Sequence, residues 1–136
     1  MQIAQQSSDV HRLEGELQLV QGDRTKAIES LLLADREDST ALTIESLAHA
    51  YRVVGDTAAA IAHYEKLISK EEASLGYEPQ QDWLGAHYIL AKLYQSQGQK
   101  DKAVILADQL HQLWKEADPD LPLLKDLEKL KTELAG

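Results

Sequence analysis

Apolar residues recur every three or four positions along most of the chain, which is the spacing that places them on one face of an α-helix. The pattern is interrupted by short polar segments around Gly22, Gly55 and Gly98, and again near Pro79 and Pro119. The intervening segments predict helices at about residues 8–21, 24–36, 40–54, 57–73, 81–97, 100–116 and 120–135. The chain is therefore predicted to be all-α.

One spacing recurs in step with these segments: a glycine followed five residues later by an alanine. It occurs at Gly22, Gly55 and Gly98, which are separated by 33 and then by 43 residues. The position seven residues before each glycine also holds a small residue. The small residues of the pattern are Gly15, Ala27, Ala48, Ala60, Ala91 and Ala103. The chain is therefore predicted to contain one structural unit three times, with about nine residues inserted before the third.

The second unit, from Ala41 to Tyr64, resembles a tetratricopeptide repeat, and the third unit, from Ile89 through Ala103, follows it closely. The resemblance implies three antiparallel pairs of helices, A and B, in a right-handed superhelix with a C-terminal capping helix. It implies a single domain divided into repeat one at about 8–39, repeat two at about 40–73, an insertion at about 74–82, repeat three at about 83–117 and a capping helix at about 120–135. Repeat one departs from the family pattern, with Glu14 and Gln18 where Leu and Tyr are usual and His11 where Trp is usual.

The recurring residue types have local physical reasons. Small residues allow the two helices of a pair to approach closely, and each glycine ends an A helix in a left-handed conformation that costs glycine little. Asp23, Asp56 and Asp101 are predicted to cap or stabilise the starts of the B helices. Larger residues are predicted to fill the space between repeats, namely Leu47, Tyr51, Ile61, Leu90 and Tyr94.

Composition narrows the class of function. The formal net charge of −9 disfavours binding to nucleic acid or to an anionic membrane, since both require a positive surface. The chain has no cysteine, which excludes disulfides and thiolate metal sites and suits the cytoplasm. No run approaches the roughly 20 apolar residues of a membrane span, and no signal peptide is recognisable. A cytoplasmic location is predicted.

The sequence carries no pattern typical of an enzyme. The five histidines form no His-Glu-x-x-His motif and no pair four residues apart, and neither a nucleophile elbow nor a phosphate-binding loop is present. His11 and His87 lie at a position where the family usually packs a Trp, so packing is the preferred interpretation for both. We expect no catalytic residues, no metal site and no cofactor.

The resemblance implies that a partner binds on the concave wall, which is lined by A-helix positions. Matching register predicts a partner-binding set of Arg12, Glu16, Leu19, Glu45, His49, Arg52, Val53, Tyr88, Lys92 and Gln95. This set combines cations with apolar side chains, which suits a peptide bearing an acidic group and an apolar anchor. The clamp by which some family members bind a chaperone's terminal carboxylate is missing, because Arg12, Glu16, Ser46, Gly85 and Ile89 occupy its positions. The predicted function is that of a scaffold or adaptor for a protein or peptide partner.

The sequence leaves open the oligomeric state, the form of the insertion and whether the chain belongs to a larger protein. A homodimer is expected instead if the first helix leaves Leu13, Leu17 and Leu19 exposed. The insertion either forms a turn at Gly76 to Pro79 or presents Tyr77 and Trp83 as an aromatic lip for a partner. Residues 113–122 also resemble the ends of repeat arrays in bacterial signalling proteins, which implies a module of a larger regulatory protein.

Overall fold

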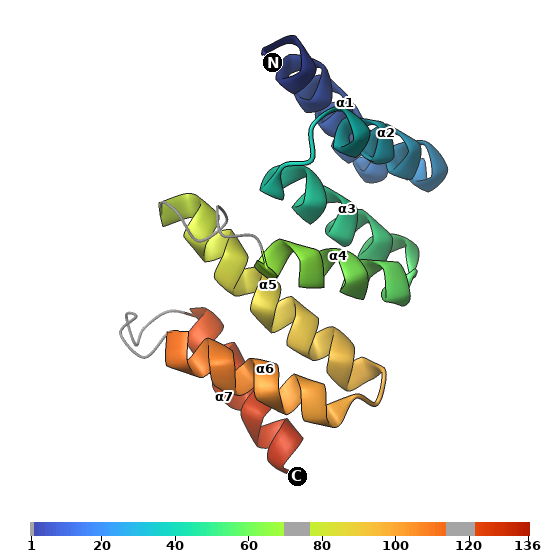
Figure 1. Ribbon diagram of the computed structural model, residues 1–136. Helices are drawn as coiled ribbons and strands as arrows, with labels where there is room; N and C mark the ends of the chain where they lie inside the picture. The colour runs from blue at the N-terminus through green and yellow to red at the C-terminus, as the bar shows by residue number, and fades with distance from the viewer. Residues whose placement is uncertain (1, 70–76, 114–121) are drawn as a thin grey trace. The chain divides into compact units, whose positions relative to one another are not determined.

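The computed structural model describes residues 2–69, 77–113 and 122–136, with side chains over 7–69, 84–112 and 124–136 (Figure 1). These residues form helices and no strand, so the predicted all-α fold is confirmed. The helices are α1 (Gln2–Val20), α2 (Arg24–Glu37), α3 (Ala41–Val54), α4 (Thr57–Ser69), α5 (Tyr77–Ser96), α6 (Lys100–Leu113) and α7 (Pro122–Ala135).

Two helix starts differ from the prediction. Helix α1 begins at Gln2 rather than near residue 8, because Gln and Ala in its first turns are good helix formers. Helix α5 begins at Tyr77, so the backbone from Tyr77 to Pro79 is helical where a turn was predicted. Pro79 is tolerated there because the first turn of a helix has no acceptors for its N–H groups. The rest of the insertion, the side chains of the proposed aromatic lip, and the predicted helix ends at residues 73 and 116 lie outside the described residues.

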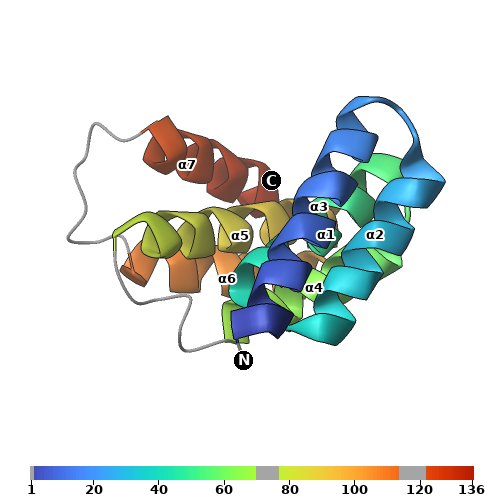
Figure 2. The same ribbon diagram turned by 90° about the horizontal axis from the view of Figure 1, so that it is seen from above.

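The chain divides into two compact units, Met1–Glu72 and Ala73–Gly136, and each is described by itself. The first unit holds the helix pairs α1/α2 and α3/α4, with α2 packed on α3 (Figure 2). Its centre is a cluster of Leu31, Leu47 and Ala50, against which Leu19 and Tyr51 pack. The predicted role of Leu47 and Tyr51 between repeats one and two is therefore confirmed.

Small residues permit the close approach within each pair. The alanines of the pattern are all fully buried, namely Ala27, Ala48, Ala60, Ala91 and Ala103. Gly15 is the closest contact, because a Cβ atom placed there would lie 2.6 Å from Cγ and 2.8 Å from Cδ2 of Leu31. The backbone of α1 at Gly15 therefore touches the side chain of Leu31 on α2 directly.

The turns inside the three pairs share one geometry. Gly22, Gly55 and Gly98 have φ values of 87°, 88° and 73°, as predicted for left-handed residues that end a helix. The carboxylates of Asp23 and Asp56 then accept hydrogen bonds from the backbone N–H groups of Lys26 and Ala59, with N···O distances of 3.3 Å and 3.2 Å. Asp101 lies in the first turn of α6, where its charge faces the positive end of the helix dipole.

The second unit consists of the pair α5/α6 with α7 packed mainly against α6 and also touching α5. Helix α7 buries Leu127, Leu130 and Leu134, and it exposes charged residues on its other side. This is the amphipathic capping helix that the leucine spacing predicted. His87 on α5 is 5% exposed, as expected for a packed residue at the position of the family's Trp.

Candidate partner-binding surfaces

The predicted site residues of the first unit lie on α1 and α3, and a polar network joins the two helices. Ser46 Oγ donates a hydrogen bond of 2.8 Å to Glu16 Oε1. The other carboxylate oxygen, Glu16 Oε2, lies 3.5 Å from Arg12 Nη1, and the Arg12 side chain is only 17% exposed. Glu16 therefore links repeats one and two, and the positive charge of Arg12 is already compensated.

Arg52 differs from Arg12 because it is exposed to solvent. Its Nη2 atom lies 3.1 Å from His49 Nδ1, one turn earlier on α3. Its guanidinium also lies close enough to the side chain of Tyr64, which is 2% exposed and belongs to α4, to lower the pKa of that group. Burial raises the pKa of Tyr64, and the guanidinium of Arg52 opposes that rise. Arg52 is thus a solvent-facing cation that hydrogen-bonds His49 and lies near Tyr64.

The surroundings of His49 lower its pKa and so favour its neutral form. Partial burial lowers its pKa from 6.5, the nearby positive charge of Arg52 lowers it further, and the carboxylate of Glu16 opposes both effects. His49 therefore contributes hydrogen bonding to this surface rather than a second positive charge.

The titration of His49 provides a direct check of this network. Its midpoint in an NMR pH titration is expected below 6.5. Arg52→Gln should raise the midpoint because it removes a cation, and Glu16→Gln should lower it because it removes an anion. Movement of the midpoint in the same direction in both variants would contradict the charge arrangement described here.

The apolar residues Val53 and Leu19 of the predicted set differ in their exposure to solvent. Val53 is 39% exposed. Leu19, by contrast, packs against the cluster of Leu31, Leu47 and Ala50 and is partly buried. The register placed both on the inner wall, but Leu19 serves mainly as packing between repeats one and two.

In the second unit, α7 lies alongside two of the three predicted site residues. Gln95 Nε2 donates a hydrogen bond of 3.3 Å to Glu133 Oε2. Burial raises the pKa of Tyr88, and the carboxylates of Asp126 and Glu133 on α7 raise it further. Lys92 is exposed and makes no ion pair within the described part of the chain. Lys92 is therefore the accessible cation of the predicted set in this unit.

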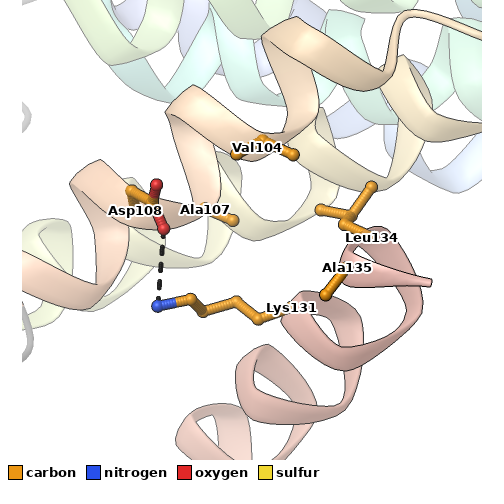
Figure 3. A pocket seen from close by; sticks show the side chains of 6 residues that line it. All are labelled: Val104, Ala107, Asp108, Lys131, Leu134 and Ala135. Carbon is orange, nitrogen blue, oxygen red and sulfur yellow. Dashed lines mark ion pairs between the residues drawn. The ribbon is translucent and has the colours of Figure 1, made fainter.

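A pocket of about 170 Å³ lies between α6 and α7 (Figure 3). Its lining is mainly apolar, and at its edge Lys131 Nζ lies 3.4 Å from Asp108 Oδ1. Small-molecule sites usually measure about 300–1,000 Å³, so the pocket has room for a side chain rather than for a cofactor. The sequence did not reveal it because it depends on how α7 packs against α6.

His11 Nδ1 on α1 contacts Glu37 Oε1 on α2, so this histidine lies between two helices where the family usually packs a Trp. Over the ranges with described side chains, no three His, Asp or Glu residues are grouped to hold a metal ion. None of the described helices is both long and apolar enough to cross a membrane.

The comparisons with known proteins agree with the repeat pattern. Two family models, both described as tetratricopeptide repeat, match residues 43–75 and residues 86–116. No curated protein matches the chain. The matched segments correspond to repeats two and three, and α1 and α2 form a further helix pair of the same construction. The chain thus contains tetratricopeptide repeats at residues 43–75 and 86–116.

Proposed function

We propose that this chain is an adaptor that binds a segment of a partner protein on the inner surfaces of its A helices. Tetratricopeptide repeats generally mediate protein–protein interaction and are typically non-catalytic scaffolds. The observation that carries the proposal is the state of Arg52: it is exposed, it hydrogen-bonds His49, and it neighbours the exposed Val53.

This arrangement favours a peptide with an acidic group beside an apolar side chain. A guanidinium that is already fixed by hydrogen bonds loses less conformational entropy when it pairs with a carboxylate. Lys92 offers a second exposed cation on the other unit. Arg12 does not contribute in this way, because Glu16 already neutralises it. The proposed recognition charges are therefore Arg52 and Lys92.

The test is the double variant Arg52→Glu with Lys92→Glu. Partner capture from a lysate of the source organism, with bound proteins identified by mass spectrometry, should fall by at least about tenfold, because a carboxylate on the partner would then meet like charges. Helicity and thermal melting should stay close to those of the unmodified chain, since both side chains are exposed.

The matched control is Lys125→Glu with Lys129→Glu, which changes the net charge equally on the exposed side of α7. The control should capture the same proteins as the unmodified chain. Capture that persists in the Arg52/Lys92 variant, or that is lost equally in the control, would show that the inner surfaces are not the binding site.

Self-association is the alternative function, and one observation favours it. Leu13 and Leu17 on α1 are 56% and 58% exposed, although Leu19 is not. Against it, the same face carries the exposed carboxylates of Asp9 and Glu14. A two-fold contact between α1 helices would bring these negative charges close to those of the second copy. A mass that doubles with concentration in light scattering would support the homodimer.

The cellular setting is a further part of the proposal. The resemblance of residues 113–122 to the ends of repeat arrays supports a role within a larger bacterial regulatory protein, and the lack of cysteine suits the cytoplasm. Cell fractionation of the source organism would test the location.

A further inference from the structure

Helix α1 carries an apolar stripe that no described part of the chain covers. Its members are spaced by three, four and three residues, which places them on one side of the helix. They are 54%, 56%, 58% and 86% exposed, and in chain order they are Val10, Leu13, Leu17 and Val20. Isolated exposed apolar residues are ordinary on a protein surface, but a continuous stripe of four indicates a contact surface.

The opposite side of α1 attaches the helix to its unit. Ser8 is 2% exposed, and its Oγ donates a hydrogen bond of 2.8 Å to the carbonyl oxygen of Ala34 on α2. Gly15 lies against Leu31, also on α2. Because Ser8 and Gly15 are on the side of α1 away from the stripe, the stripe points away from α2. A partner therefore meets a helix whose orientation is already fixed.

Carboxylates border the stripe on both sides. Asp9 and Glu16 lie along one border and Glu14 lies along the other, and all three are exposed. Arg12 compensates Glu16, whereas Asp9 and Glu14 make no ion pair within the described residues. The surface is thus apolar in the middle and negatively charged at its borders.

We propose that this outer face of α1 docks an amphipathic helix of a partner protein that has an apolar stripe bordered by Lys or Arg. The alternation of three and four is the spacing at which two helices interlock their side chains at a shallow angle. Basic borders on the partner would lie opposite Asp9 and Glu14. A second copy of α1 fits less well because its own borders are acidic. The residues of this stripe differ from Arg52 and Lys92, the proposed recognition charges.

The probes are two designed helical peptides with the same leucine stripe, one with Lys at its borders and one with Glu. Isothermal titration calorimetry should show that the Lys peptide binds at least about tenfold more tightly than the Glu peptide. Leu13→Gln with Leu17→Gln should weaken binding of the Lys peptide by at least about tenfold. Ile105→Gln, at a position that is 59% exposed on α6, is the matched control and should leave the affinity unchanged.

A charge reversal separates specific docking from general attraction of a basic peptide to an acidic protein. Asp9→Lys with Glu14→Lys should reverse the preference, so that the Glu peptide binds more tightly. Equal affinity for the two peptides, an unchanged preference in the reversed variant, or equal loss in Ile105→Gln would overturn the proposal. A dimer of the unmodified chain that Leu13→Gln with Leu17→Gln dissociates would also overturn it, because the occupant would then be a second copy. Far-UV circular dichroism confirms that each variant is folded.

Discussion

Leu31→Ala is expected to lower the free energy of unfolding by about 3 kcal/mol, because it leaves a cavity in a packed interior. Leu31 is fully buried, belongs to the cluster with Leu47 and Ala50, and touches the backbone of α1 at Gly15. It therefore joins the two helices of repeat one and also joins repeat one to repeat two. Urea denaturation followed by circular dichroism measures the change.

The control for Leu31→Ala is the same substitution at Leu13, which is 56% exposed on α1. Leu13→Ala should change the free energy of unfolding by less than about 0.5 kcal/mol. Similar losses at the two positions would mean that repeat one does not pack on repeat two as described.

Gly15→Ala is expected to destabilise the chain by about 2 kcal/mol, although alanine is the better helix former. The added Cβ would lie 2.6 Å from Leu31 Cγ and 3.1 Å from the carbonyl oxygen of Ala27, so α1 and α2 would have to separate. The matched control is Gly85→Ala on α5, where an added Cβ meets no atom within 4 Å. That control should stabilise the chain by about 0.5–1 kcal/mol, because only helix propensity changes.

The double variant Gly15→Ala with Leu31→Ala adds a sharper measurement. Alanine at position 31 lacks the two carbon atoms that the Cβ at position 15 would meet most closely. The losses of unfolding free energy in the two single variants should therefore add up to more than the loss in the double variant, by at least about 1 kcal/mol. Simple additivity would show that the destabilisation at Gly15 does not arise from contact with Leu31.

The sequence predicted those features of the fold that depend on neighbours along the chain. The conformation of Gly55 and the capping by Asp56 follow from residues within one turn, so a short pattern is enough to predict them. The burial of Ala48 and Ala60 followed from their recurrence in step. The start of α1 was missed because helix starts without a capping residue depend on small differences in propensity.

The candidate site was predicted less completely, because its properties depend on contacts between helices. The repeat register placed Arg12 and Arg52 on A helices. It did not show that Glu16 compensates the charge of Arg12, or that Arg52 instead hydrogen-bonds His49 and lies near Tyr64. Register likewise did not distinguish Leu19, which packs in the cluster, from Val53, which is exposed. Such differences are decided by side-chain packing between repeats, which a single sequence does not display.

The two terminal helices differ in a way that matters for protein engineering. Helix α7 turns Lys125, Glu128 and Lys129 to water, so a hairpin fused after it would have to desolvate charges without gaining apolar contact. Helix α1 offers the opposite situation, because Leu13 and Leu17 would be buried by a hairpin grafted in front of it. Lengthening the array by design is therefore energetically favourable in one direction along the chain and unfavourable in the other.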